Sequence, residues 1–378
     1  MRSDLQITRI PQHSPEWFEY RKSGIGGSEM STVLGLNKYD TVTRTFYEKI
    51  GMIEPRQIDN AKMFFGRYME DNIAELWKYY DGSPDGWIEN YKNKKIIRDC
   101  RAVNGFVVNP KYPWLFGSFD RVQNIKGGIN LITGEKLTTE AVLEIKTLSY
   151  WSSQMWSDGI PISYLIQIHV YMIILETNYA EIAILKDGND FTVEKYQRDD
   201  SLCERIINIS KAFWYNLVLP AKQAYANKLE AEKTGNIAAI EEWDAEIVKH
   251  EPEPDHSAAY ESFMSERFLK ERDFIEGDIE SYNLCTKDKM LLGINGRIDD
   301  ERQLIRNILI NKLTKSGAEA IDFGKLGQCT YSDRKGAKNK TFSNRVKEKP
   351  DEDRIEKEFQ KVNWNLNEDE DGSGENGK

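Results

Sequence analysis

A chain of 378 residues, of which 39% are hydrophobic and 11% aromatic, is long and apolar enough to bury one large core or two, which excludes an intrinsically disordered protein. Its net charge of −10 excludes a polycation that coats nucleic acid, but not a DNA enzyme with one positive channel. The four cysteines form no Cys-x-x-Cys pair, and the sequence shows neither a signal peptide nor an apolar run of about 20 residues, so we expect a reduced, cytoplasmic protein without a membrane segment.

The first predicted elements are two short helices joined by a glycine-rich turn. The first helix begins after Ser14, which can cap it, and carries Trp17 and Arg21 on one face. The turn, residues 23–29, leaves backbone N–H groups open to an anion and places Ser28 to cap the next helix. This pattern fits a phosphate-binding loop or an ordinary helix–helix turn, and both interpretations stay open.

An amphipathic helix and then strands follow. The helix covers residues 62–80 and carries Glu70, which is ordinarily a solvated residue on such a helix. One or two strands are expected within residues 96–108, and an aromatic strand over residues 114–122 ends near Asp120.

The central prediction is a buried strand over residues 141–147 that carries two charged side chains. Glu144 and Lys146 are two residues apart, so they project from the same face of the strand. They form the only Glu-x-Lys in the chain, and burying such charges is costly unless they are paired. A satisfied ion pair and a metal-dependent nuclease site both explain them. Asp120 is preferred to Asp85 as the second acidic residue, because Asp120 lies on a strand candidate that can pair beside residues 141–147.

A strongly apolar helix over residues 162–175 comes next, followed by strands over residues 180–185 and 191–196. The helix carries Gln167, and a buried glutamine needs a hydrogen-bond partner, whether a water, the backbone or a functional site. Helices are predicted over residues 202–233, 237–249, 258–276 and 299–313, with a kink or break at Pro220 and a glycine-containing link between the last two helices.

A basic segment lies near the C-terminus. Residues 325–349 contain eight Lys/Arg against two Asp/Glu, with Tyr331 and Phe342 among them. Aromatic residues interleaved with basic ones are typical of nucleic-acid binding, but a plain surface hairpin explains them equally well.

The predicted elements follow a fixed order: a helix and turn with Arg21 and Ser28, a helix with Glu70, a strand ending in Asp120, a strand with Glu144 and Lys146, and a helix with Gln167. This order resembles YqaJ-type viral recombinases and lambda exonuclease, of the PD-(D/E)xK nuclease superfamily. Trp17, the Gly-Ile-Gly-Gly-Ser turn and the segment Gly66-Arg67-Tyr68-Met69-Glu70 add to the resemblance. The resemblance covers residues 10–200 or so. It implies an α/β fold, with a restriction-endonuclease-like core of a mixed central sheet flanked by helices, and a mainly helical C-terminal extension. The sequence departs from the family in having Phe119-Asp120-Arg121 where Pro-Asp-Gly is common, and in a longer insert before Glu144.

The resemblance also implies residue roles. The implied catalytic residues are Asp120, Glu144, Lys146 and Gln167. The implied ligands of two Mg²⁺ or Mn²⁺ ions are Glu70, Asp120, Glu144 and the backbone carbonyl of Ile145. The implied ligands of a DNA 5′-phosphate are Arg21 and Ser28.

The function that the resemblance implies is a Mg²⁺-dependent 5′→3′ exonuclease that degrades double-stranded DNA from its ends. Such an enzyme works with a single-strand annealing recombinase in the cytoplasm of a phage's bacterial host, and its relatives form homo-oligomeric rings. An endonuclease or structure-specific DNase on the same core, and a non-catalytic DNA-binding assembly protein, are the alternatives. The expected segments are a nuclease core at 1–200, a helical extension at 201–324, a basic segment with a hairpin and short helix at 325–363, and an acidic disordered tail at 364–378.

Overall fold

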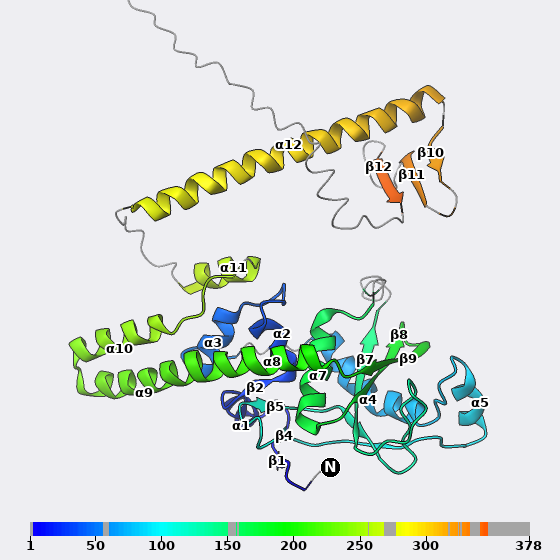
Figure 1. Ribbon diagram of the computed structural model, residues 1–378, viewed down its shortest axis with the longest axis horizontal. Coiled ribbons are helices and arrows are strands. Elements are labelled where there is room, and N and C mark those ends of the chain that lie inside the picture. The colour runs from blue at the N-terminus through cyan, green and yellow to red at the C-terminus, as the bar shows by residue number, and fades with distance from the viewer. Residues whose placement is uncertain are drawn as a thin grey trace, which may run out of the picture. The chain divides into compact units, whose positions relative to one another are not determined.

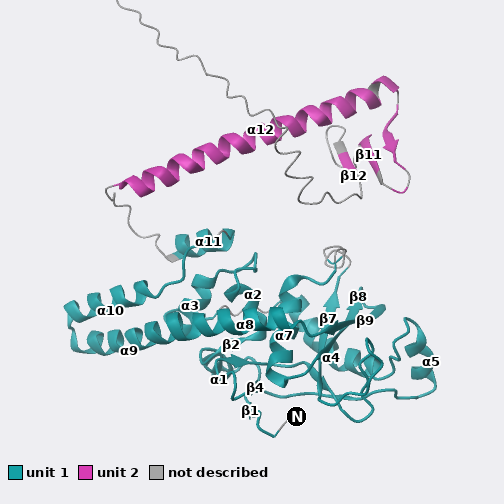
Figure 2. Cartoon of the chain, viewed as in Figure 1, with its two compact units in different colours: residues 1–271 teal, residues 272–378 magenta. Residues whose placement is uncertain are grey.

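The computed structural model describes residues 3–55, 60–149, 156, 159–255, 257–267, 277–316, 318–323, 325, 327–332 and 341–346. The chain divides into two units, residues 1–271 and residues 272–378 (Figure 2). The four segments predicted from the sequence stay a prediction, and the predicted acidic tail lies outside the described residues.

A five-stranded mixed sheet organises the first unit (Figure 1). In spatial order its strands are β3 (Cys100–Arg101), β6 (Arg121–Gln123), β7 (Ala141–Leu148), β8 (Tyr179–Lys186) and β9 (Asp190–Gln197). β7 and β8 are parallel, and every other neighbouring pair is antiparallel. The strand predicted at residues 141–147 is therefore confirmed, and it is the central strand of the sheet.

Helices cover the sheet, which confirms the predicted fold class of a mixed sheet flanked by helices with a mainly helical C-terminal part. The helices of the first unit are α1 (Pro15–Arg21), η1 (Gly27–Glu29), α2 (Met30–Val33), α3 (Val42–Ile50), α4 (Ala61–Trp77), α5 (Gly86–Lys92), α7 (Ile162–Leu175), α8 (Asp200–Ala212), the π-helix η2 (Phe213–Val218), α9 (Leu219–Thr234), α10 (Ile237–Lys249) and α11 (Ala258–Arg267). As predicted, Ser14 caps α1, because its Oγ accepts a hydrogen bond from the backbone N–H of Trp17.

Two short two-stranded sheets complete the first unit. They pair β1 (Gln6–Thr8) with β4 (Phe106–Val108), and β2 (Ile25–Gly26) with β5 (Leu115–Phe116). The single strand predicted over residues 114–122 is wrong. The chain leaves β5, Gly117 bonds to the backbone of Val107, and Asp120 occupies a bend directly before β6.

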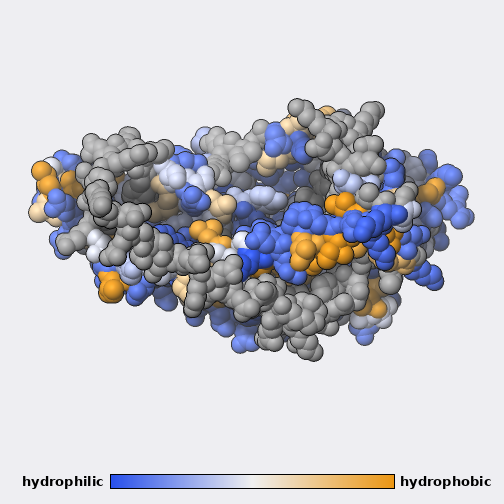
Figure 3. All heavy atoms as spheres, turned by 90° about the horizontal axis from the view of Figure 1, so that it is seen from above, coloured by the Kyte–Doolittle hydropathy of each residue, from blue (hydrophilic) through white to orange (hydrophobic). Residues whose placement is uncertain are grey.

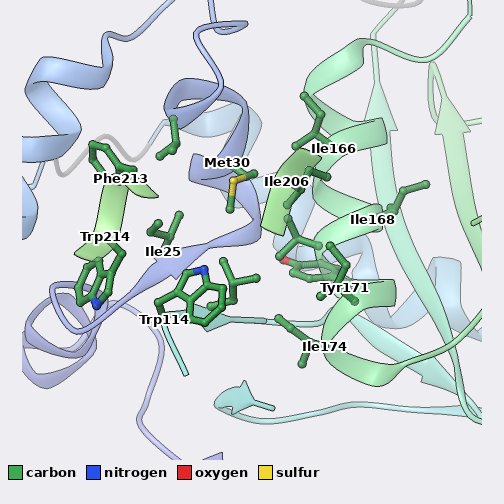
Figure 4. Packing of buried hydrophobic residues seen from close by; sticks show 14 of the residues in the cluster. Ile25, Met30, Trp114, Ile166, Ile168, Tyr171, Ile174, Ile206, Phe213 and Trp214 are labelled. Atoms are coloured by element: carbon green, nitrogen blue, oxygen red, sulfur yellow. The ribbon is translucent and has the colours of Figure 1, made fainter. Parts of the chain in front are cut away.

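The main hydrophobic core forms around α7, which is buried along most of its length and packs against β7, β8, η1, α2 and α8. Figure 4 shows apolar side chains from several elements meeting there, among them Ile25, Met30, Ile166, Ile206 and Trp214. α8, η2 and α9 thus contribute to the core of the first unit. Of the kink or break predicted at Pro220, the break is wrong, because η2 passes into α9 without interruption and Pro220 falls in the first turn of α9.

A second core lies between α4 and the other face of the sheet. Leu143 and Ile145 of β7 pack there with Ile73 and Trp77 of α4. Glu144 therefore points to the opposite face of β7, as the alternation of the strand predicts.

The second unit contains one long helix and a small antiparallel sheet. These are α12 (Ile279–Ser316), which has 38 residues, and the strands β10 (Ala320–Asp322), β11 (Gly327–Ser332) and β12 (Thr341–Val346), paired in that order. The glycine-containing link predicted before residue 299 is wrong, because Gly293 and Gly296 lie inside α12. Several exposed apolar residues belong to this helix, including Leu284, Leu291 and Ile305.

On the face of the protein drawn in Figure 3, residues of high hydropathy lie next to residues of low hydropathy. Among the described helices, none combines the length and the hydropathy needed to cross a bilayer.

Candidate active site on the central strand

The carboxylate of Glu144 is the centre of the candidate site. Its side chain is 2% exposed, and its Oε1 accepts hydrogen bonds from Lys146 Nζ at 2.5 Å and from Gln167 Nε2 at 2.8 Å. Its Oε2 is buried and has no hydrogen-bond partner within the described part of the chain. Glu144 and Lys146 therefore form an ion pair on a single strand, and one oxygen of this buried carboxylate still needs a partner.

Asp120 lies beside Glu144 because of the way β6 leaves β7. β6 pairs with β7 only as far as Arg121 opposite Leu143, so the N–H of Ile145 lies beyond the end of β6. Asp120 Oδ2 accepts that N–H at 2.9 Å. Asp85, the alternative acidic residue, instead lies at the start of α5. The structure thus places the Asp120 carboxylate at the peptide N–H that follows Glu144, close enough for its charge to raise the pKa of Glu144.

Glu70 adds a third carboxylate to this group. Burial, followed by the charge of Asp120, raises the pKa of Glu70 to about 7. Burial and Asp120 also raise the pKa of Glu144, to about 8. Burial lowers the pKa of Lys146, but the charges of Glu144 and Asp120 outweigh it and raise this pKa above its ordinary value. Arg121 partly balances the acidic group, since its Nη1 lies 3.9 Å from Glu70 Oε2.

These oxygen donors fit a hard divalent cation. Carboxylates that lie close together raise one another's pKa, and a bound cation would relieve this repulsion. The unpartnered Oε2 of Glu144 is an oxygen atom that could coordinate such a cation. In the described ranges, no three Asp, Glu, His or Cys side chains converge closely enough to hold a metal by themselves. The predicted ligand set also includes Glu70, but a single ion needs only the carboxylates of Asp120 and Glu144, completed by the backbone carbonyl of Ile145 and water.

Gln167 is fixed by a chain of contacts that the sequence did not assign to the site. Its Nε2 lies 3.1 Å from the Tyr171 hydroxyl, and that hydroxyl donates to the backbone oxygen of Ser118 at 2.8 Å. The signal in the sequence was the shared face of Gln167 and Tyr171, four residues apart on α7. Tyr171 also packs against the glycine turn, because a Cβ on Gly27 would lie 2.5 Å from Tyr171 Cε1.

We expect Gly27→Ala to lower both stability and catalysis. The added methyl group must displace Tyr171, which costs about 1–3 kcal/mol of unfolding free energy and moves Gln167 away from Glu144. Urea denaturation and a DNA cleavage assay measure the two effects. Gly66→Ala is the control, since its Cβ would meet only Thr147 Oγ1 at 3.6 Å, and alanine should stabilise helix α4 by about 0.5–1 kcal/mol. Equal behaviour of the two variants would contradict this role of Gly27.

Arg21 and Ser28, the predicted phosphate ligands, line one pocket of about 450 Å³. An adjoining pocket of about 240 Å³ is lined by Glu70 and Asp120, and Trp17 lines both pockets. The guanidinium of Arg21 lies 4.7 Å from the centre of the Trp17 ring. The structure therefore brings the two predicted groups of residues to neighbouring pockets.

Glu29 neutralises much of the positive charge in the first pocket. Its Oε1 lies 2.5 Å from Arg21 Nη2, and its Oε2 accepts from Lys49 Nζ and from the Gly26 N–H, each at 2.8 Å. The predicted capping role of Ser28 is wrong, because Ser28 lies within η1 and the N-cap residue of α2 is Glu29, with no side-chain capping hydrogen bond. No local pattern indicates this network, since Lys49 comes from α3.

The same network predicts a pH-dependent contribution to stability. Burial would raise the pKa of Glu29, but the charges of Arg21 and Lys49 lower it to about 2. A carboxyl with a lowered pKa stabilises the fold above its unfolded pKa of about 4.3, and this contribution disappears as the pH falls through about 2. We expect Glu29→Gln to cost on the order of 3 kcal/mol at pH 7, and less at pH 3.

Urea denaturation of Glu29→Gln and of the native chain at both pH values measures this difference. Glu54→Gln is the control, because the side chain of Glu54 is 75% exposed. A difference in unfolding free energy that stays constant between pH 7 and pH 3 would show that Glu29 does not titrate as inferred.

The fold and this cluster define an α/β protein with an acid–acid–lysine site on its central strand. Residues 16–180 match the model of the YqaJ-like viral recombinase domain, which confirms the predicted resemblance. The uncharacterized protein YqaJ of Bacillus subtilis (strain 168) is 29% identical over 250 residues, which are 63% of this chain and 70% of that protein.

Two solved structures are also similar to this chain. The alkaline exonuclease LHK-Exo from Laribacter hongkongensis has a TM-score of 0.41 and 17% identity, and its complex with dAMP has a TM-score of 0.41 and 18% identity. Each match covers 59% of this chain and 99% of the other chain. The family match ends at residue 180, so β9 and everything that follows it lie outside the matched domain.

Proposed function

We propose that this chain is a Mg²⁺-dependent deoxyribonuclease that degrades double-stranded DNA from its ends in the 5′→3′ direction. The observation that carries the proposal is the buried, unpartnered Oε2 of Glu144, next to Asp120 and in an ion pair with Lys146. This arrangement supplies oxygen donors for a cation together with a positive group for the reacting phosphate. The match of residues 16–180 to the YqaJ-like viral recombinase domain supports the assignment.

In the proposed hydrolysis, a water oxygen bonds to phosphorus while the bond from phosphorus to the leaving oxygen breaks. The proton that the attacking water loses passes to solvent, and the leaving oxygen takes up a proton from solvent, so the reaction balances. A bound Mg²⁺ or Mn²⁺ ion, or a pair of them, supplies the charge that polarises the phosphodiester and activates the water. Lys146, held beside Glu144, orients the water and the phosphate by hydrogen bonds. Gln167 holds the Glu144 carboxylate in place through its side-chain amide.

End recognition is proposed for the pocket with Arg21 and Ser28. A guanidinium is suited to a terminal 5′-phosphate through paired hydrogen bonds. The product is then a duplex with a 3′ single strand, the substrate of a single-strand annealing recombinase, which we propose as the partner in phage-type recombination. A homo-oligomeric ring around DNA and a location in the bacterial cytoplasm belong to the same proposal.

One observation favours a second candidate, an endonucleolytic or structure-specific DNase on the same core. Glu29, Asp40 and Glu48 line the same pocket as Arg21, and Glu29 already pairs with that residue. A 5′-phosphate must compete with this carboxylate for the guanidinium. If it cannot, cleavage does not depend on the DNA end.

The test uses three substrates with Mg²⁺: linear duplex with a 5′-phosphate, linear duplex with a 5′-hydroxyl, and closed circular DNA. We expect rapid loss of the 5′-phosphorylated linear DNA alone, and loss of that preference in Arg21→Gln. Cutting of the circles would support the second candidate. Binding without cleavage of any substrate would contradict the nuclease proposal.

A further inference from the structure

The second unit carries a concentration of positive charge that the proposed active site does not use. Residues 302–349 contain twelve Lys/Arg and four Asp/Glu, a local net charge of +8 in a chain whose overall net charge is −10. This segment lies beyond the family match at residues 16–180. Its positive charge therefore needs an explanation of its own.

Part of this charge surrounds a pocket of about 370 Å³. The pocket is lined by Arg302, Ile305, Arg306 and Leu309 of α12, and by Asn344 of β12. Arg302 and Arg306 are four residues apart and share one face of the helix. Arg302 pairs with Asp299 at 2.8 Å, but both side chains are more than half exposed, so this pair is weak and the guanidinium can exchange it for another anion.

The pocket combines two kinds of contact. Two guanidinium groups one turn apart match consecutive phosphates, since arginine forms bidentate hydrogen bonds to phosphate oxygens. Ile305 is 50% exposed and, with Leu309, supplies an apolar surface between the cations. A duplex keeps its bases stacked in its interior, whereas a single strand can place an unstacked base on an apolar surface beside its own phosphates.

We propose that this surface binds single-stranded nucleic acid, with Arg302 and Arg306 on its phosphates and Ile305 and Leu309 beneath a base. The inference rests on the proposed function for its biological ligand, because 5′→3′ digestion of one strand leaves the other strand single. The second unit would then retain the product strand for the next step of recombination.

The test measures binding of the full chain to a fluorescent oligo-dT of about 20 nucleotides by anisotropy, over a series of salt concentrations and with EDTA present to prevent cleavage. We expect Arg302→Gln/Arg306→Gln to weaken binding about tenfold or more and to reduce the slope of log K against log salt by about 1.4, or 0.7 for each lost phosphate contact. Arg302→Lys/Arg306→Lys keeps both charges and should keep most of that slope.

The matched control is Lys287→Gln/Lys289→Gln, which removes two charges from the same helix but outside the pocket. We expect this control to bind within about twofold of the native chain, since a specific site loses little from distant charges at moderate salt. Equal weakening by the control, unchanged binding of Arg302→Gln/Arg306→Gln, or a larger loss for blunt duplex than for oligo-dT would each overturn the inference. The cleavage assay with three DNA substrates reports on the nuclease separately, so a failure of either proposal is recognised by itself.

Discussion

Replacing Lys146 with alanine should lower the rate of DNA hydrolysis by about 10²–10⁴-fold, the range typical for loss of a group that handles a proton or a developing charge. The ammonium of Lys146 is held 2.5 Å from Glu144 Oε1 and lies 5.0 Å from the centre of the Tyr164 ring. Lys146 is the positively charged side chain that β7 contributes to the proposed site, and alanine removes this charge from the reacting phosphate. Cleavage of 5′-phosphorylated linear duplex in Mg²⁺ measures the effect.

A measurement of DNA binding distinguishes a role of Lys146 in the reaction from a role in the structure of the site. Because Arg21 and Ser28 are untouched, we expect Lys146→Ala to bind DNA ends within a few-fold of the native chain when Mg²⁺ is absent. Lys195→Ala, on the last strand of the sheet, is the control and should cleave at the native rate. A Lys146→Ala variant that cleaves as fast as the native chain would show that this lysine has no part in the reaction.

Replacing Glu181 with alanine should lower the free energy of unfolding by about 3–5 kcal/mol, because it leaves a buried charge without a counter-charge. Glu181 and Arg98 are 0% and 1% exposed, and their side chains meet at 2.5 Å. Glu181 also accepts hydrogen bonds from Trp77 Nε1 at 2.6 Å and from the Tyr179 hydroxyl at 2.5 Å. This one carboxylate therefore joins α4, β8 and the chain before β3.

Urea denaturation measures the loss. The double variant Arg98→Met/Glu181→Leu removes both charges and should recover much of the stability, because apolar replacement of a buried ion pair is often neutral. Glu194→Ala, on β9, is the control for removing a carboxylate from the same sheet. A loss below about 1 kcal/mol in Glu181→Ala would mean that the Arg98 guanidinium finds water or another partner.

The elements that carry the site were predictable because their signals are local. A strand places alternate residues on opposite faces, so Glu144 and Lys146 separate from Leu143 and Ile145 wherever the strand lies. The apolar periodicity of residues 162–175 likewise placed Gln167 on a buried helix. Ser14 indicated the start of α1 through its capping chemistry alone.

The contacts between these elements were not predictable, because they depend on the path of the chain. Asp120 reaches Ile145 only because β6 stops pairing at Arg121. The partners of Glu29 come from α1, the glycine turn and α3 together. Gly293 indicated a link between helices, yet it lies within α12, where the cost of about 1 kcal/mol for a glycine does not end the helix.

Diffraction from crystals of the full chain soaked in Mn²⁺, recorded at a wavelength where manganese scatters anomalously, tests the central claim most directly. The account predicts an anomalous peak about 2.0–2.3 Å from carboxylate oxygens of both Asp120 and Glu144, and its loss in Asp120→Asn. Peaks only elsewhere on the protein, or an unchanged peak at this position in Asp120→Asn, would contradict the assignment of a metal site to the central strand.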